Sequence, residues 1–308
     1  MYIVYSAMCL IFGTTFLAIK VGVNVGAPPF LFAGARFFTA GLIVLLAVKL
    51  CGRSITLPKG HYKSIFIVGL FMTALMFGCL YWGEQYISSS LAALLAATTP
   101  LMIGLVEWFQ GVKEYSLIRG SGLLISFLGV SIALLPALML EATPYAFLAV
   151  IVILLAEVGN VFGTMTAQKL LAANISPFTL NGWQMVIGGT LLMLLSLGTE
   201  SFSITESTDL LMIALLYLIF LGSLGGHGAY YWLVGRAGML LPSTWTYVSP
   251  VIAQFVGYYI LGEALSFYSF VGLILVLSGV LFVSKPALIS KKYQQLRFKK
   301  SQLNRLNH

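Results

Sequence analysis

Ten stretches of predominantly apolar residues follow one another along the chain, with short connections between them. A helix that crosses the hydrocarbon core of a membrane needs about 20 such residues. The stretches cover approximately residues 2–23, 29–50, 64–83, 88–109, 117–136, 144–168, 177–197, 210–232, 241–261 and 266–284. The pattern predicts an all-α integral membrane protein with ten transmembrane helices.

The amino-acid composition points to the same class. Of the 308 residues, 59% are hydrophobic and only 8% are charged, whereas ordinary soluble domains contain about 25% charged residues. So few charges cannot solvate the surface of a soluble globule of this length. The composition therefore argues against a soluble enzyme, a disordered chain and a nucleic-acid partner, although the net charge is +8.

The cysteines and the N-terminus add two further expectations. Cys9, Cys51 and Cys79 are odd in number and widely spaced, so we expect neither a disulfide framework nor a metal site. The first apolar stretch has no basic segment before it and is too long for a signal peptide. We expect it to be the first transmembrane helix.

The distribution of Lys and Arg gives the predicted helices a direction, because cytoplasmic loops carry an excess of these residues. With the N-terminus in the cytoplasm, 15 of the 17 basic residues fall on the cytoplasmic side. They are Lys49, Arg53, Lys59, Lys63, Lys113, Arg119, Lys169, Arg236, Lys285, Lys291, Lys292, Arg297, Lys299, Lys300 and Arg305. The loops on the other side contain no Lys or Arg but hold Glu84, Glu141, Glu200, Glu206, Asp209 and Glu263. Both chain ends are therefore predicted to be cytoplasmic, with residues 287–308 as a basic tail near the anionic leaflet.

The two halves of the chain repeat each other. An offset of 150 residues aligns the second half with the first, and a shift of two residues in loop length changes the offset to 148 upstream. The aligned pairs at 150 are Tyr81/Tyr231, Trp82/Trp232, Gly78/Gly228, Pro100/Pro250, Gly122/Gly272, Gly129/Gly279 and Pro136/Pro286. Those at 148 are Pro29/Pro177, Phe30/Phe178, Gly34/Gly182 and Gly41/Gly189. The chain is predicted to contain two five-helix units, at residues 1–138 and 142–286.

A repeat of five helices has a topological consequence. Because five is odd, the second unit must enter the membrane from the side opposite to the first. Inverted repeats of this kind recur in transporters, where two related halves exchange roles between inward-open and outward-open states. The sequence therefore favours a transporter.

Several short segments along the chain carry a family resemblance through their order and spacing. They are Phe12–Lys20, Ala35-Arg36-Phe37, Ser90–Pro100, Tyr247-Val248-Ser249-Pro250 and Leu261-Gly262-Glu263. The chain resembles the EamA-type ten-span family of the drug/metabolite transporter superfamily, and the resemblance covers nearly the whole chain. The chain departs from the family at Phe12, where Trp is common, and at Gly111–Glu114, where a Gly-Glu pair is common. The resemblance implies a secondary carrier for small metabolites, often amino acids or related compounds, and often an exporter.

We therefore expect a transporter that moves a small metabolite or drug-like molecule across the cytoplasmic membrane by alternating access. Export is the expected direction, and coupling to protons is one hypothesis. An uncoupled facilitator of the same fold is the alternative. A polytopic enzyme is less favoured, because the scattered His61, His227 and His308 form no catalytic cluster. A primary pump is also less favoured, because the sequence lacks the phosphate-binding loop that such a pump needs. We expect no cofactor, and the oligomeric state is not predicted.

Glu157 is the leading candidate for proton coupling, because an ionisable residue inside a membrane is expensive and marks a functional site. It lies near the middle of the sixth stretch, and helical spacing places Asn160, Thr164 and Gln168 on its face. The string Leu155-Ala156-Glu157-Val158 also resembles the first helix of the small multidrug resistance proteins, whose glutamate there couples drug and proton. The alternative is a structural carboxyl that is hydrogen-bonded to a neighbouring helix.

Other charged residues allow several interpretations. Arg36 is predicted to contact a substrate carboxylate, to pair with Glu157 or to snorkel to the outer interface. Lys20 and His227 are weaker candidates, as an interfacial anchor and a packing residue are their simpler interpretations. Glu107 is expected at the inner interface.

We further expect a central cavity between the fourth and ninth helices, near the second, sixth and seventh. Pro100 and Pro250 occupy equivalent depths there and are expected to kink their helices. Aromatic side chains can stack on a flat substrate. Besides Arg36, the candidate lining residues are Thr99, Pro100, Asn160, Asn181, Trp183, Gln184, Trp245, Tyr247, Pro250 and Gln254.

Overall fold

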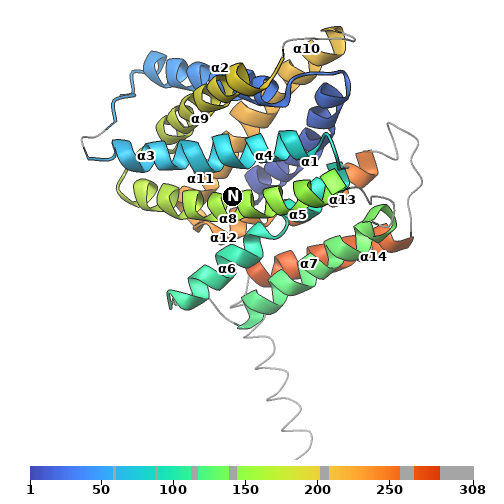
Figure 1. Ribbon diagram of the computed structural model, residues 1–308. Coiled ribbons are helices and arrows are strands. Elements are labelled where there is room, and N and C mark those ends of the chain that lie inside the picture. The colour runs from blue at the N-terminus through green and yellow to red at the C-terminus, as the bar shows by residue number, and fades with distance from the viewer. Residues whose placement is uncertain are drawn as a thin grey trace, which may run out of the picture.

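The computed structural model describes residues 1–57, 60–87, 89–111, 117–138, 144–201, 208–256 and 267–284, and the side chains of residues 89, 90, 133–138, 208, 253–255, 269 and 284 are not described within these ranges. Every regular element in these ranges is a helix (Figure 1). The helices are α1 (Tyr2–Asn24), α2 (Pro29–Leu50), α3 (Tyr62–Gly69), η1 (Leu70–Leu75), α4 (Met76–Gly83), α5 (Ser89–Ala96), α6 (Thr99–Phe109), α7 (Leu117–Leu138), α8 (Pro144–Ala172), α9 (Pro177–Thr199), α10 (Thr208–Tyr217), η2 (Leu218–His227), α11 (Gly228–Ala237), α12 (Leu240–Ser243), α13 (Trp245–Val256) and α14 (Phe267–Ser284).

The predicted class, an all-helical membrane protein, is confirmed. Seven helices of the described part are long and apolar enough to cross a membrane. Shorter apolar helices cover Leu117–Ile132 and Phe270–Val283. The number of ten spans, their orientation and the inverted repeat stay predictions, and the basic tail at 287–308 lies outside the described residues.

Proline and left-handed backbone positions define two of the helix connections. Pro29 and Pro177 stand at the first turns of α2 and α9, where the missing N–H has no helical partner to lose. Gly26 (φ 87°) and Asn174 (φ 62°) lie just before these prolines. Both connections close with the same backbone hydrogen bond, Ala27 N to Gly22 O and Ile175 N to Leu170 O, each 3.2 Å long. These bonded pairs are themselves related by the offset of 148 residues.

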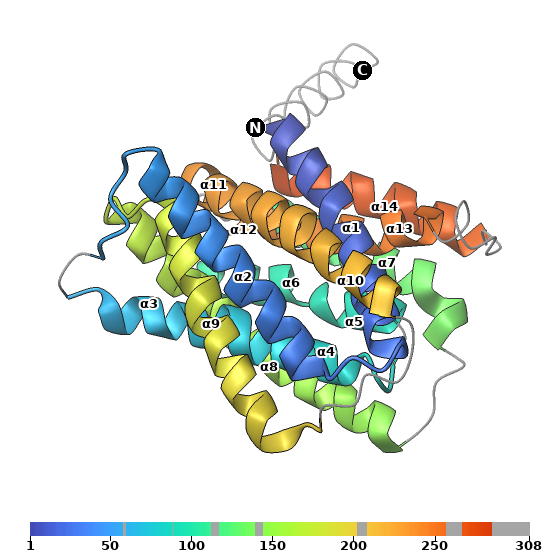
Figure 2. The ribbon, with the colours of Figure 1, turned by 90° about the horizontal axis from the view of Figure 1, so that it is seen from above.

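Two helix pairs cross at glycines. Figure 2 shows α2 running alongside α9, and α7 packs in the same close manner on α14. A Cβ atom on Gly41 would lie 2.8 Å from the carbonyl oxygen of Gly182, and one on Gly122 would lie 2.7 Å from that of Gly279. Small residues at such crossings let two backbones approach closely, which is the usual way membrane helices associate.

Polar side chains are turned inward and large apolar ones outward. Arg36, Glu157 and Gln184 are each about 1% exposed. The bundle surface instead carries large apolar side chains, including Leu46, Phe66, Leu155, Phe162, Leu194 and Leu281. This arrangement suits a protein whose solvent is lipid, because buried polar groups then find partners only inside the bundle.

Two of the predicted membrane stretches are broken helices. The fourth divides into α5 and α6, with the break at residues 97–98 and Pro100 at the start of α6. The ninth divides into α12 and α13 at Thr244, and Pro250 lies inside α13. The expectation of two equivalent mid-helix prolines is therefore wrong for Pro100, which opens a helix without removing a backbone bond within it.

Candidate functional site

A small cavity lies at the centre of the bundle, where side chains from α1, α4, α6, α8, α9, α11, α12, α13, η1 and η2 meet. Its volume is about 40 Å³, enough for a few water molecules and well below the roughly 300–1,000 Å³ of ligand pockets. Polar and aromatic residues dominate its wall. The main ones are Thr99, Glu157, Asn160, Gln184, His227, Ser243, Phe12, Phe77, Tyr230 and Trp245. A metabolite enters this space only when the walls separate.

Glu157 is held in the cavity wall by neutral hydrogen-bond donors. Thr99 Oγ1 donates to Glu157 Oε2, and Asn160 Nδ2 donates to the same oxygen at 3.0 Å. Thr99 comes from α6, and Asn160 lies one turn after Glu157 on α8. Among the described residues that line the cavity, Glu157 is the only one with a carboxyl group. The structure therefore brings together three of the residues that the sequence predicted for the site, Glu157, Thr99 and Asn160.

Thr164 and Gln168 continue the polar face of α8 away from Glu157. Thr164 is 1% exposed, and its hydroxyl lies 3.9 Å from the sulfur of Met72. Gln168 lines a different pocket at the end of the bundle. One helix face therefore joins the central cavity to a second polar region.

Arg36 is buried, and it contacts neutral groups. Its Nε donates to Ser223 Oγ at 2.9 Å, and its Nη1 donates to the Tyr81 hydroxyl at 2.8 Å. The Phe37 and Phe77 ring centroids lie 4.5 and 5.4 Å from its Cζ. Snorkelling is therefore wrong for Arg36, and so is a direct pair with Glu157, whose carboxylate bonds to other residues.

Gln184, the counterpart of Arg36 in the second half, makes a matching contact. Its Oε1 accepts a hydrogen bond from Thr73 Oγ1 at 2.6 Å. The offset of 148 relates Arg36 to Gln184, and the offset of 150 relates Thr73 to Ser223. Each half therefore sends a long polar side chain to a hydroxyl on a π-helical segment of the other half, η1 or η2. Only Gln184 reaches the cavity wall.

His227 also lines the cavity. Its Nδ1 lies 3.1 Å from the carbonyl oxygen of Gly222. Phe12, Phe37 and Phe77 surround the imidazole, with ring centroids 5.1, 5.6 and 5.4 Å away. The apolar cage and the single carbonyl contact fit the simpler expectation of a packing residue.

Lys20 is drawn away from the cavity to the end of α4. Its Nζ donates to the carbonyl oxygens of Glu84 and Ile87, at 2.5 and 3.1 Å. Glu84 itself, assigned from sequence to an outer loop, is completely buried. Burial raises the pKa of its carboxyl well above the ordinary value, and the charges of Lys20 and Arg36 oppose this shift only in part.

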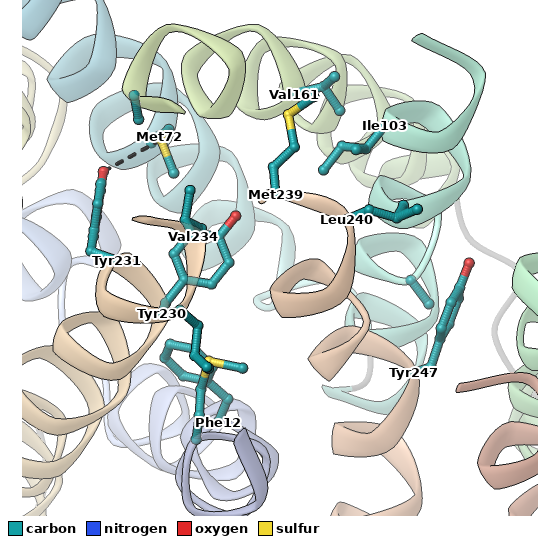
Figure 3. Close-up of a cluster of buried hydrophobic side chains, with 14 of the residues drawn as sticks. Phe12, Met72, Ile103, Val161, Tyr230, Tyr231, Val234, Met239, Leu240 and Tyr247 are labelled. Carbon is teal, nitrogen blue, oxygen red and sulfur yellow. Dashed lines mark hydrogen bonds between the residues drawn. The ribbon is translucent and has the colours of Figure 1, made fainter. Parts of the chain in front are cut away.

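Several predicted lining residues lie elsewhere. The Trp183 indole N–H donates to the Ile55 carbonyl at 2.9 Å, so this ring packs under the segment after α2. Asn181 is buried next to Gln184, and its Oδ1 accepts a bond of 3.4 Å from the Gln184 side chain. Tyr247 is buried on α13 with its hydroxyl turned away from the cavity residues Phe12 and Tyr230 (Figure 3). The remaining members of this group are Pro100 and Pro250, which are absent from the described cavity wall, and Gln254, whose side chain lies outside the described residues.

Sequence reasoning missed the partners of the charged residues. Tyr81 was noted only for its place in the repeat, and Thr73 and Ser223 were not singled out. The signal for these two was available, because the offset of 150 aligns two small hydroxyl residues. Nothing in the sequence distinguishes Glu84 from the other loop acids. Among the described residues, no cluster of three His, Cys, Asp or Glu side chains is arranged to hold a metal ion.

A polytopic helical bundle with a buried polar centre is an architecture that membrane transporters use. The EamA-like transporter family model matches residues 1–135 and again residues 147–285. The chain therefore belongs to the EamA-like transporter family.

Individual relatives agree with this membership. The chain is 26% identical over 288 residues to an uncharacterized inner membrane transporter, YedA, of Escherichia coli strain K12, covering 90% of this chain and 88% of that protein. It is 25% identical to an uncharacterized transporter, YoaV, of Bacillus subtilis, covering 89% and 93% of the two chains. A transporter of Buchnera aphidicola is 24% identical, with 86% and 87% covered.

A solved protein structure shares the fold. It superposes with a TM-score of 0.77 at 15% sequence identity, covering 92% of this chain and 97% of the other. The family and the relatives identify a multi-pass protein of the cytoplasmic membrane, and their names point to a transporter rather than to an enzyme. Membership of a transporter family implies a small molecule as the substrate.

Proposed function

We propose that this protein is a proton-coupled secondary transporter that exports a small metabolite by alternating access, with Glu157 as the proton carrier. The central observation is the position of Glu157, a buried carboxyl in the wall of the central cavity. Its described partners, Thr99 and Asn160, are neutral donors. A carboxyl without a fixed cation can exchange a proton for a substrate group as the cavity changes its exposure.

The proposed architecture is ten membrane helices in two inverted five-helix units, residues 1–138 and 142–286, with both ends in the cytoplasm. Three reciprocal features support it. The family model matches twice, the Arg36–Ser223 contact has its counterpart in Gln184–Thr73, and the α2/α9 and α7/α14 crossings use glycines related by the repeat. Two related halves of this kind can rock about a shared central site.

Reporter fusions test the proposed orientation. A phosphatase reporter, which is active only outside the cytoplasm, and a fluorescent reporter, which is active only inside, are joined to each chain end in separate fusions. We expect fluorescence and no phosphatase activity at both ends. Ends on opposite faces would reject the inverted repeat, whatever the substrate is.

Proteoliposomes test the proton coupling. The vesicles contain a pH-sensitive dye, and a panel of radiolabelled amino acids and amines is offered under an imposed pH gradient. We expect gradient-driven uptake of at least one compound, with accompanying proton movement, in the wild type. In Glu157→Gln the gradient should no longer drive accumulation, while Thr99→Val, which keeps the carboxyl, should retain the coupling at reduced rate.

The same assay separates the alternatives. If Glu157→Gln accumulates substrate as well as the wild type, Glu157 is not the carrier. If the wild type equilibrates a substrate without responding to the pH gradient, the protein is an uncoupled facilitator of the same fold.

A further inference from the structure

A second polar pocket lies at one end of the bundle, and we call it the inner pocket. It is lined by residues from α6, α7, α8, α11, α12 and α14 and from the turns after α6 and α11, among them Glu107, Gln110, Arg119, Gln168 and Gly238. Glu107 was expected at a membrane interface, but it is only 7% exposed. According to the predicted orientation, this end of the bundle faces the cytoplasm.

Four elements, α6, α8, α11 and α12, line both the central cavity and the inner pocket. On α6, Thr99 faces the cavity and Glu107 faces the pocket, eight residues further along. On α8, Asn160 and Gln168 are related in the same way. Eight residues of helix span about 12 Å, and side chains at this spacing lie on one helix face. Of the other two elements, α11 contributes Tyr230 to the cavity and Ala237 to the pocket, and α12 contributes Ser243 to the cavity and Leu240 to the pocket.

One apolar layer fills the space between the two polar regions. Ile103 lies midway between Thr99 and Glu107 on α6, and it is completely buried. Figure 3 shows Ile103, Val161, Met239 and Leu240 gathered together, on a side of the cluster away from Phe12 and Tyr231. All four belong to the same buried hydrophobic cluster. A constriction of this kind blocks water and polar solutes without any charged group.

The segment that carries Met239 and Leu240 is short and is bounded by a break in the helix on each side. α11 ends at Ala237, Gly238 follows with φ 73° and ψ −177°, and α12 is only four residues long. This backbone conformation is open to glycine and is strained for every other residue. A short helix between a glycine turn and the break at Thr244 has a backbone break at each end, about which its direction can change.

We propose that the inner pocket is the cytoplasmic antechamber of the transport path, and that Ile103, Val161 and Leu240 form the gate between it and the central cavity. The gate opens when α12 turns about Gly238. The antechamber presents amide, carboxyl and guanidinium groups, so it receives small polar or charged metabolites before they reach Glu157. This proposal rests on the proposed function in taking the central cavity as the substrate site and in placing this end of the bundle at the cytoplasm.

Cysteine accessibility tests the gate without any knowledge of the substrate. In a background where Cys9, Cys51 and Cys79 are replaced by Ser, one reporter cysteine replaces Ser243 in the cavity, and another replaces Gln168 in the antechamber. A charged, membrane-impermeant thiol reagent is applied to inside-out and right-side-out vesicles separately. We expect fast labelling of Gln168→Cys from the cytoplasmic face and slow labelling of Ser243→Cys.

Widening the gate should expose only the cavity reporter. Leu240→Ala is expected to raise the labelling rate of Ser243→Cys from the cytoplasmic face by about ten-fold or more, because the apolar layer then admits water. The rate for Gln168→Cys should stay unchanged. Gly238→Ala should act in the same direction, since it strains the turn that holds α12 in the closed position. Leu192→Ala, at an equally buried site outside this layer, is the matched control and should leave both rates unchanged.

Each outcome has a clear meaning. Monodisperse elution and a single thermal transition establish that each variant is folded, and the milder Ile103→Val replaces Leu240→Ala if that variant fails this check. Equal acceleration by Leu192→Ala, or no acceleration by any folded gate variant, overturns the gate. Acceleration confined to the opposite face keeps the gate and rejects the predicted orientation instead. Proton-driven accumulation that persists in Glu157→Gln would reject the carrier role of Glu157 while leaving these labelling rates as they are.

Discussion

The guanidinium of Arg36 donates a hydrogen bond to the hydroxyl of Ser223 at 2.9 Å, joining α2 to the π-helical segment η2. The positions related to them by the sequence repeat hold Gln184 and Thr73, which form a neutral hydrogen bond at 2.6 Å. One half of the bundle therefore has a charge where the other has an amide. The cost of burying that charge is met by Ser223, by the Tyr81 hydroxyl and by the faces of two phenylalanine rings.

Two substitutions of Arg36 distinguish the contribution of its charge to stability from the contribution of its hydrogen bonds. We expect Arg36→Ala to lower the thermal stability in detergent, because it leaves buried Ser223 and Tyr81 hydroxyls without this donor, at about 1–3 kcal/mol for each unsatisfied group. Arg36→Gln installs the side chain of the second half and retains a donor, so its loss should be clearly smaller. Thermal unfolding followed by tryptophan fluorescence measures both. Equal losses in the two variants would show that the charge itself, rather than hydrogen bonding, stabilises this site.

The α7/α14 crossing predicts a large difference between two glycine substitutions. A Cβ on Gly279 would lie 2.2 Å from Ser126 Oγ and 2.4 Å from the Gly122 carbonyl oxygen, whereas one on Gly198 meets nothing within 4 Å. Gly279→Ala should therefore force the two backbones apart and cost about 1–3 kcal/mol. Gly198→Ala should be neutral or stabilise the protein by up to about 1 kcal/mol, because alanine is the better helix former. Similar unfolding temperatures for the two variants would contradict the close packing of α7 on α14.

Glu84 predicts a specific dependence of stability on pH. Because burial raises the pKa of its carboxyl, the folded protein holds this proton more tightly than the unfolded chain does. The stabilising contribution of Glu84 is therefore fully present below the unfolded pKa of about 4.5 and is lost as the pH rises through the higher folded value. Glu84→Gln, which resembles the protonated carboxyl, should raise the unfolding temperature at neutral pH, by roughly 2–4 °C for each kcal/mol relieved.

The pH profile supplies the control for this substitution. The gain from Glu84→Gln should shrink toward zero as the pH falls to the unfolded pKa. Glu200→Gln is a comparison variant, because Glu200 accepts backbone hydrogen bonds from Phe30 and Leu31 at 2.7 and 3.0 Å. That substitution should destabilise instead. A gain from Glu84→Gln that stayed constant with pH would mean that shape rather than charge explains the effect.

Much of the fold follows from sequence patterns that are local or strictly periodic. The apolar stretches, Pro29 and Pro177 predicted the helices and their starts, because each depends on residues close together in the chain. The glycine pairs were visible through the repeat, and the structure places those of α7 and α14 against one another. The breaks at residues 97–98 and Thr244 were not predicted, since they depend on how helix ends pack around the cavity.

The site was predictable only where one helix face carries it. Glu157 and Asn160 lie on α8 at a spacing of three residues, so their contact followed from helix geometry. Trp183, by contrast, was expected at the cavity and instead binds the Ile55 carbonyl. The rotation of a helix about its axis is set by tertiary packing, which one sequence without its partners does not encode in any local pattern.

The charge of the cavity wall predicts which substrates the proposed transporter prefers. Glu157 brings an acidic group to the wall, and Arg36 is not among the described lining residues because it is engaged by Ser223 and Tyr81. Aromatic rings of Phe12 and Trp245 also face the cavity, and such rings attract cations.

Phenethylamine and phenylpropionate share an aromatic body and differ in the sign of their charge. In binding measurements on the purified protein, we expect phenethylamine to bind at least about ten-fold more tightly, equivalent to roughly 1.4 kcal/mol. Glu157→Gln should reduce that preference, whereas Arg36→Gln should leave it unchanged. Tighter binding of phenylpropionate, lost in Arg36→Gln, would show that the guanidinium leaves its two hydroxyl partners and contacts the substrate carboxylate.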